Sequence, residues 1–364
     1  MQMHAKRRDR LRSTLKKSGV PALLVTNEIN VTYLTGFTGD SSYLLLTGSD
    51  AIILTDSRYT TQLEEESPDV PFVSRTSSTS MVQILQKELK SRKLESIAVE
   101  GDTLSKNQFD LFTSKLDGVE LVSTSEWVET LRQIKDRNEM AEIRRSIHLA
   151  ERTFDFIRAT LTPEMPERLV AANIEHQIRQ FGGVGCAFKP IVGVGPRAAL
   201  PHAVPGERRI EESPFVLIDW GAKAGLYMSD LTRVLVTGKI STKLCRIYEV
   251  VLRAQLAAIE AIRPGVACSA VDRAARSVIE EAGYGKRFGH GLGHGFGLEI
   301  HESPRMSSAN ESILKPGMVV TVEPGIYLPD WGGVRIEDDI LVTTDGHEVM
   351  THVEKNLDAC VLNL

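Results

Sequence analysis

Residues 214–238, PFVLIDWGAKAGLYMSDLTRVLVTG, hold two apolar runs separated by a turn signal near Ala224-Gly225. A two-residue turn at that point predicts an antiparallel hairpin in which Asp219 lies directly opposite Asp230. Directly opposed side chains share one face of a sheet, with Cβ atoms roughly 4.5–5.5 Å apart. The segment therefore predicts two neighbouring carboxylates within an otherwise apolar pair of strands.

Residues 318–343, MVVTVEPGIYLPDWGGVRIEDDILVT, repeat this pattern with two further acids. A loop centred on Asp330 would set Glu323 opposite Glu337, so that two acid-bearing hairpins face one cavity. An isolated acid at a strand end is usually a turn cap or a solvated residue. Asp219, however, has apolar neighbours on both sides, and a buried carboxylate without a partner is costly. The acids are therefore expected to lie together and to share a bound partner.

The glycine-rich segment GHGLGHGFG, residues 289–297, adds a histidine to the four acids. Oxygen ligands with one nitrogen suit divalent cations such as Mn²⁺, Co²⁺ or Zn²⁺. Two cations about 3.5–4 Å apart are a common device for activating water against an amide or a phosphate ester. The sequence therefore predicts a site for two divalent metal ions, most simply Mn²⁺, whose ligands are Asp219, Asp230, His294, Glu323 and Glu337.

These segments resemble the signature segments of the aminopeptidase P/prolidase branch of the pita-bread metallopeptidases. The segments that carry the resemblance are LIDWGA, SDLTR, GHGLGHGFGLEIHE, VEPGIY and GGVRIED, and it is strong over residues 136–364. The earlier part, with YLTGFTG at residues 33–39 and LTDSRYT at residues 54–60, is similar to the creatinase-type N-terminal domain of the same branch.

Two domains are expected from the length of 364 residues and from the order of the predicted elements. Helix and strand signals alternate over residues 1–130, which predicts an α/β domain, and the resemblance makes it creatinase-like. The polar, charged segment 125–138 is the expected boundary. Residues 136–364 are expected to form an α+β pita-bread domain, with helices packed on a curved antiparallel sheet.

The resemblance implies a role for each ligand. Asp219 would bind one metal ion and His294 the other, while Asp230 and Glu337 would bridge both. Glu323 would bind metal and also carry the proton to the leaving nitrogen. The matching residues of the family hydrolyse a peptide bond, so the site is expected to act on an amide.

Three further histidines gain a role only from their motifs, since a lone histidine is more often a structural imidazole. The resemblance implies that His202 in ALPHAVPG and His301 in LEIHESP are catalytic and hydrogen-bond the substrate and the oxyanion. It places His290 in the substrate pocket.

The other candidate substrate-binding residues are Arg305, Arg335 and Phe188. Arg305 resembles a position that prolidases use to grip the free carboxylate of a dipeptide, although a surface arginine is equally compatible. Arg335 shares a strand face with Glu337 and is expected to order nearby carboxylates or to form a structural ion pair. Phe188 is expected to wall an apolar pocket, with core packing as the alternative.

Composition excludes some classes of function. The net charge of −5 gives no footprint for nucleic acid, and neither a signal peptide nor a membrane-spanning run is expected. The four cysteines are scattered, which is typical of free thiols in a reducing compartment, so a cytoplasmic protein is expected. Dimers are common in the resembled family, and a homodimer is expected.

The first functional interpretation is an Xaa-Pro aminopeptidase, which acts on peptides with proline at the second position. An Xaa-Pro dipeptidase (prolidase) with the same site is the alternative, and Arg305 favours it. Methionine aminopeptidase shares the ligands but usually lacks the N-terminal domain, and creatinase uses no metal. A non-catalytic peptide binder of the same fold is disfavoured because all five ligand positions are intact.

Overall fold

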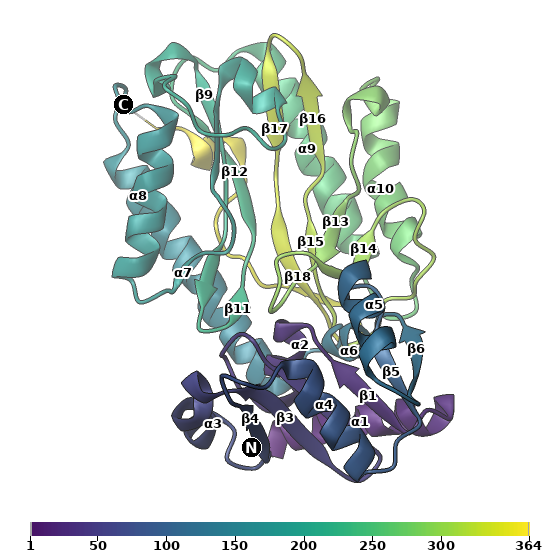
Figure 1. The fold of residues 1–364 in the computed structure, drawn as a ribbon. Helices are drawn as coiled ribbons and strands as arrows, with labels where there is room; N and C mark the ends of the chain where they lie inside the picture. The colour runs from purple at the N-terminus through teal and green to yellow at the C-terminus, as the bar shows by residue number, and fades with distance from the viewer. Residues whose placement is uncertain (1, 363) are drawn as a thin grey trace. The chain divides into compact units, whose positions relative to one another are not determined.

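The structure is a computed structural model that describes residues 2–362 and 364, and it divides into two compact units, Met1–Arg132 and Gln133–Leu364 (Figure 1). The division falls inside the polar segment 125–138. A short helix, α6, occupies the first half of that segment, and helix α7 begins in its second half, at Arg137.

The first unit is an α/β layer, built on a six-stranded mixed sheet in the order β4-β3-β2-β1-β5-β6. Its strands are β1 (Ala22–Val25), β2 (Tyr43–Thr47), β3 (Ala51–Asp56), β4 (Phe72–Arg75), β5 (Ser96–Glu100) and β6 (Glu120–Thr124). Its helices are α1 (Gln2–Ser18), α2 (Glu28–Thr35), α3 (Thr60–Glu66), α4 (Met81–Ser91), α5 (Lys106–Lys115) and α6 (Trp127–Arg132). Strand β2 pairs antiparallel with both β1 and β3, and the other pairs are parallel.

One face of this sheet is covered by α4 and α5, whose ends are set by the local sequence. The hydroxyls of Ser80 and Ser105 each accept a hydrogen bond from the backbone N–H three residues on. The side-chain oxygens of Gln83 and Gln108 in turn accept one from the backbone N–H of these serines. These capping boxes satisfy backbone donors at the helix starts. Apolar residues of the two helices and of the strands then form one core.

The second unit contains the acid-bearing segments, and every strand pair among its described residues is antiparallel. Its strands are β7 (Gly185–Cys186), β8 (Ile191–Val194), β9 (Phe215–Trp220), β10 (Ala222–Ala224), β11 (Tyr227–Met228), β12 (Leu231–Val236), β13 (Gly293–Gly295), β14 (Glu302–Met306), β15 (Val319–Val322), β16 (Gly325–Leu328), β17 (Gly332–Arg335), β18 (Asp338–Val342) and β19 (His347–Val349). Its helices are α7 (Arg137–Thr160), α8 (Glu167–Gln180), α9 (Thr242–Ala261) and α10 (Cys268–Glu281).

Side-chain alternation along β9 decides which way its aspartate faces. Ile218 and Trp220 belong to the core with α7 and α8, where Trp220 stacks on Phe154 at a ring-centroid distance of 4.9 Å. Leu217 belongs to a second core with α9 and α10. Because alternate residues of a strand share a face, Asp219 points to the same side as Leu217, away from α7 and α8.

The hairpin around residues 214–238 differs from the sequence prediction in its register. The two-residue turn lies at Gly225-Leu226, one residue later than expected, because Ala224 pairs with Tyr227. Gly225 takes the left-handed φ of +55° that this turn requires. As a result Asp219 lies opposite Thr232, not opposite Asp230. The prediction of directly opposed aspartates is therefore wrong.

The second hairpin has the predicted register. Val322 pairs with Asp338, and Gly325 pairs with Arg335, so both ladders follow one register. Glu323 and Glu337 lie opposite each other in the interval between the two ladders. The turn is centred on Asp330, which adopts a φ of +64°.

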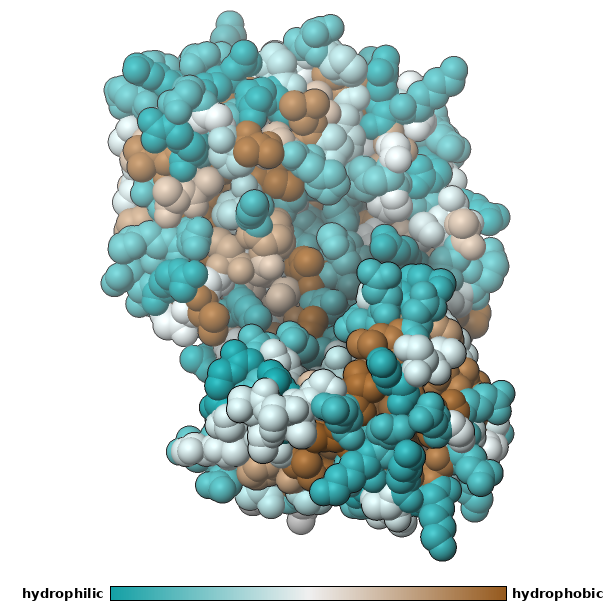
Figure 2. Space-filling view, in the orientation of Figure 1, coloured by the Kyte–Doolittle hydropathy of each residue, from teal (hydrophilic) through white to brown (hydrophobic). Residues whose placement is uncertain are grey.

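The face of the protein seen in Figure 2 is mostly hydrophilic, with scattered apolar residues. Large apolar side chains that are exposed include Val204 and Leu200, at 80% and 52%. Within residues 2–362 and 364, no helix has the length and apolar character needed to cross a bilayer.

Candidate metal centre

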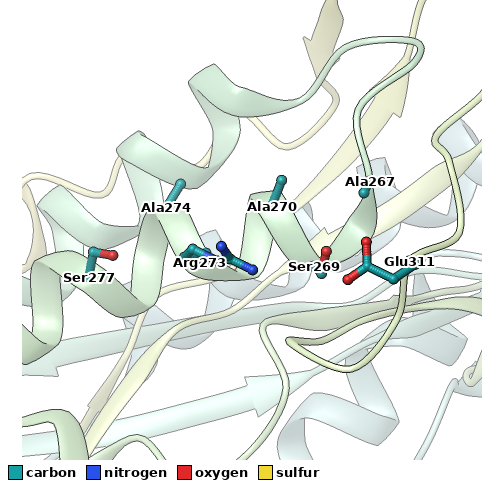
Figure 3. A pocket seen from close by; sticks show the side chains of 7 residues that line it. All are labelled: Ala267, Ser269, Ala270, Arg273, Ala274, Ser277 and Glu311. Atoms are coloured by element: carbon teal, nitrogen blue, oxygen red, sulfur yellow. The ribbon is translucent and has the colours of Figure 1, made fainter.

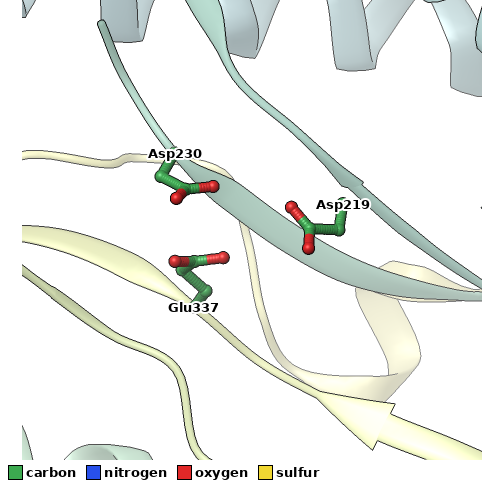
Figure 4. A group of neighbouring side chains, drawn as sticks. All are labelled: Asp219, Asp230 and Glu337. Atoms are coloured by element: carbon green, nitrogen blue, oxygen red, sulfur yellow. The ribbon is translucent and has the colours of Figure 1, made fainter. Parts of the chain in front are cut away.

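Three buried carboxylates from separate segments of the chain meet in the second unit (Figure 4). Asp219 comes from β9, Asp230 directly precedes β12, and Glu337 directly precedes β18. One oxygen of each lies within 4.8 Å of the others. The shifted register still brings the two aspartates together, because Asp230 is two residues from Thr232 and so keeps the same face.

His294 and Glu323 complete the group. His294 Nε2 lies 3.6 Å from Asp230 Oδ2 and 3.5 Å from Glu323 Oε1. The other ring nitrogen, Nδ1, lies 3.0 Å from the carbonyl oxygen of Gly295, which can only accept a hydrogen bond. Nδ1 therefore carries the proton, and the lone pair of Nε2 is directed at the acids. Burial lowers the pKa of His294 to about 4, so the imidazole is neutral and able to ligate a metal.

The carboxylates are under-satisfied in a way that a cation would relieve. Asp219 Oδ1 and Glu337 Oε1 are buried and have no hydrogen-bond partner within the described part of the chain. Burial, followed by repulsion from neighbouring acids, raises the pKa of Asp230 and of Glu337 well above the usual range. Burial also raises the pKa of Glu323 to about 8. Oxygen-rich donors in this state fit hard divalent cations.

Arg335 orders one side of the centre. Its buried guanidinium forms an ion pair with Asp219 and donates to Thr232 Oγ1 at 3.1 Å. The Thr232 hydroxyl in turn donates to Glu337 Oε2 at 2.6 Å. The side chain is thus placed among the carboxylates, as expected from its strand face. Arg335 also donates to the hydroxyl of Tyr327.

Tyr327 is a residue that the sequence reasoning missed. Its hydroxyl accepts a hydrogen bond from Arg335 Nη1 at 2.8 Å and lies 2.9 Å from His290 Nε2. His290 Nδ1 lies 2.7 Å from the carbonyl oxygen of Gly291, so Nε2 is the acceptor for the tyrosine proton. Burial raises the pKa of Tyr327 to about 12 and lowers that of His290 to about 4, which keeps both groups neutral. The sequence signal for Tyr327 was its position four residues after Glu323, because residues an even number apart on a strand share a face.

The remaining candidates lie around the centre to different degrees. His301 is exposed, and its ring meets the ring of His294 edge-on at 4.5 Å. Arg305 is exposed on β14 and pairs with His294 in the ladder. His202 is exposed and follows Pro201, whose carbonyl oxygen lies 3.5 Å from Arg335 Nη2.

Phe188 is half-buried in the segment between β7 and β8. Strand β8 then begins at Ile191, which pairs with Asp219. The segment that carries Phe188 is therefore anchored beside a ligand strand.

A separate hollow of about 440 Å³ lies between α10 and the loop that follows β14 (Figure 3). It is lined by Ala267, Ser269, Ala270, Arg273, Ala274, Ser277 and Glu311. Small residues leave this space, and none of the predicted site residues lines it. We assign it no part in the centre.

Comparison with known proteins identifies the two units. Residues 141–344 match metallopeptidase family M24, and residues 7–134 match the creatinase/prolidase N-terminal domain. The chain belongs to metallopeptidase family M24. Its second unit has the pita-bread fold of that family, and its first unit has the creatinase-type fold, as the sequence predicted.

Several relatives align over almost the whole chain. The Xaa-Pro dipeptidase of Pyrococcus furiosus is 36% identical over 352 residues, which are 96% of this chain and 99% of the relative. The structure of an Xaa-Pro dipeptidase from Bacillus anthracis has a TM-score of 0.94 at 37% identity, covering 99% of this chain and 100% of that one. An X-Pro aminopeptidase from Thermotoga maritima has a TM-score of 0.87 at 34% identity, covering 94% and 97%.

Proposed function

We propose that this M24 family member is an Xaa-Pro dipeptidase, which hydrolyses the peptide bond before proline in dipeptides. The observation that carries the proposal is the complete five-residue centre inside a chain that aligns end to end with Xaa-Pro dipeptidases. The sequence put the aminopeptidase first and the dipeptidase second. The relatives favour the second, although the aminopeptidase structure keeps the first as a candidate.

Two divalent cations are proposed to bind at Asp219, Asp230, His294, Glu323 and Glu337, with Mn²⁺ favoured and Co²⁺ or Zn²⁺ as alternatives. Bound there, they would polarise the peptide carbonyl and activate water. The unpartnered oxygens and the neutral imidazole support this assignment.

The protein's own groups would handle the proton and the oxyanion. Glu323 is proposed to deliver the proton to the leaving nitrogen, and its raised pKa suits proton transfer near neutral pH. His202 and His301 are proposed to hydrogen-bond the substrate and the developing oxyanion. Both are exposed at the centre's edge, where a substrate can reach them.

Specificity is proposed to come from two features. The neutral His290 ring, fixed by Tyr327, and the half-buried Phe188 would line the pocket for the proline ring. Arg305 would bind the free carboxylate of a dipeptide, because a guanidinium beside the metal ligand His294 offers paired donors to that group. A longer peptide has no carboxylate at that place, which is why Arg305 supports the dipeptidase.

The setting is proposed to be the cytoplasm, with small peptides as partners and a second copy of the chain in a homodimer. Four free cysteines support a reducing compartment, and the net charge of −5 argues against nucleic acid. Neither the dimer nor the compartment is needed for the chemistry above.

The test is a matched set of substrates, Ala-Pro, Ala-Pro-Ala and Ala-Ala, assayed with Mn²⁺, Co²⁺ and Zn²⁺ in turn. We expect kcat/KM for Ala-Pro to exceed that for Ala-Ala by ~100-fold or more. Arg305→Met should raise KM for Ala-Pro roughly 10–100-fold and leave Ala-Pro-Ala little changed. The exposed Arg273→Met is the matched control. Preferred cleavage of Ala-Pro-Ala would establish the aminopeptidase instead, and purification without stoichiometric metal would favour a non-catalytic binder.

A further inference from the structure

A buried ion pair lies outside the metal centre in the second unit. Lys135 Nζ is 2.8 Å from Glu302 Oε2, and the two side chains are only 1% and 6% exposed. Removing two charges from water is costly, and their attraction offsets that cost only when geometry and further hydrogen bonds are good. A buried pair of this kind is therefore expected to make further hydrogen bonds that offset the cost of desolvation.

The second oxygen of Glu302 makes such hydrogen bonds. Glu302 Oε1 accepts hydrogen bonds from the backbone N–H groups of Leu298, at 2.9 Å, and Glu299, at 3.1 Å. One carboxylate thus joins Lys135 to the backbone of the loop that leads to His301. The loop is closed on itself around the carboxylate, and His301 is its last residue before β14.

The ion pair lies in space that is open because Gly297 has no side chain. A Cβ atom at this position would lie 2.9 Å from Lys135 Nζ and 3.0 Å from Glu302 Oε2. Any other residue would have to displace one of the two charged groups. The glycine thus lets the two charged groups approach this closely, and the reason is space, since its φ lies outside the left-handed region.

Lys135 is itself fixed from the other side. Its backbone N–H donates to the carbonyl oxygen of Gly317 at 2.9 Å. Gly317 precedes β15, the strand that leads into Glu323. Lys135 thus ties the turn before one metal-ligand strand to the loop that ends at His301.

The position of His301 depends on this arrangement. The His301 side chain is exposed. Its ring contacts the ring of His294 edge-on, with 4.5 Å between the centroids and 78° between the planes, and this contact alone holds the ring weakly. The next residue in the chain, Glu302, accepts hydrogen bonds from Lys135 and from the backbone of Leu298 and Glu299. The backbone at His301 is therefore placed by the Glu302 carboxylate.

We propose that Lys135 and Glu302 form a positioning pair that sets His301 at the catalytic centre. The inference rests on the proposed function, in which His301 hydrogen-bonds the substrate or the oxyanion. A misplacement of about 1 Å by a distant change can lower a rate by ~10²-fold. The pair acts through His301, so it is expected to affect kcat more than metal content.

Lys135→Met is the first test, since it removes the ammonium group of the pair and keeps a side chain of similar length. We expect kcat for Ala-Pro to fall roughly 10–100-fold with both metal ions still bound. The amides of Leu298 and Glu299 should lose protection from hydrogen exchange, a readout that needs no activity. The double variant Lys135→Met/Glu302→Gln keeps the acceptor oxygen, removes both charges and should recover most of kcat and of the protection.

His301→Ala and Arg144→Met are the controls. Arg144 belongs to an exposed ion pair with Glu348, so its loss should change neither readout. Lys135→Met combined with His301→Ala should be no slower than His301→Ala alone, because coupled residues are non-additive. Independent, additive losses in that cycle would overturn the positioning role.

The failures of the two proposals differ. If His301→Ala keeps full kcat, the proposed role of His301 fails, and with it the use of the pair, even if the amides lose protection. If His301→Ala is slow but Lys135→Met keeps both kcat and amide protection, the pair is not a positioning device and only this inference fails. Should Lys135→Met not fold, Glu302→Gln alone provides the same comparison, with a smaller expected loss.

Discussion

Replacing Glu337 with glutamine should change stability in opposite directions with and without metal. The Glu337 carboxylate is buried and has an oxygen within 4.8 Å of those of Asp219 and Asp230. Glutamine has the same size and can still accept the hydrogen bond from Thr232 Oγ1, 2.6 Å away. The substitution therefore removes a charge and leaves the packing in place.

The magnitude follows from Coulomb's law. Two unit charges 4.8 Å apart repel by about 3–4 kcal/mol at an effective dielectric constant of 20. Without cations the raised pKa values of Asp230 and Glu337 mean that part of this repulsion is relieved by bound protons. At pH 8 we expect the metal-free variant to gain ~1–2 kcal/mol, or about 2–8 °C in Tm for a unit of this size.

The same substitution should weaken metal binding. In a hundredfold excess over Kd, each bound ion stabilises the folded state by ~2.7 kcal/mol, and the variant should lose most of this gain. The assay is thermal unfolding after chelation and again with Mn²⁺, together with metal analysis. Glu348→Gln, at an exposed ion pair, is the control and should shift Tm little in either condition. Two ions bound at unchanged affinity, or a less stable metal-free variant, would refute the reasoning.

Three further predictions test the same centre. Because burial raises the pKa of Glu323 to about 8, its contribution to stability is present below the unfolded value of roughly 4.3 and is lost as pH rises through 8. The Tm of the chelated protein should therefore fall between pH ~5 and ~8, and saturating Mn²⁺ should remove the fall; a rising Tm would contradict this. Arg335→Met leaves the carboxylate of Asp219 buried without its cation and should cost ~3–5 kcal/mol in denaturant unfolding, against almost nothing for the control Arg273→Met. His202→Ala and His301→Ala should each lower kcat ~10²–10³-fold with metal content unchanged, and loss of an ion in either variant would make that histidine a ligand.

The two hairpins show which parts of a register can be predicted from sequence. The loop centred on Asp330 was placed correctly, so the partners Glu323 and Glu337 were too. In the other hairpin the glycine signal was correct, but Gly225 is the first turn residue and not the second. Moving a turn by one residue moves every partner by two, which changes the opposite residue but never the face. The predicted cluster therefore survives the error in register.

Contacts that join distant segments had no local pattern to reveal them. Tyr327 looks like an ordinary strand residue until Arg335 and His290 are placed on either side of its hydroxyl. Lys135 and Glu302 are separated by 167 residues, and each alone would be expected on the surface. Periodicity predicts which face a side chain takes, but only the packed fold decides which faces meet.

Charge balance at the centre explains why its carboxylates call for cations. Four carboxylates and the guanidinium of Arg335 carry a net charge of −3 if all are ionised. One divalent cation would bring that charge to −1 and two would bring it to +1, so either number relieves most of the repulsion. Burial, with repulsion from Asp219, raises the pKa of Glu323, which means that the acids retain protons when no cation is bound. The proposed pair of divalent cations would replace those protons, because binding to carboxylates releases them. The fold therefore holds its acids in a state that is costly without cations, and metal binding would remove that cost.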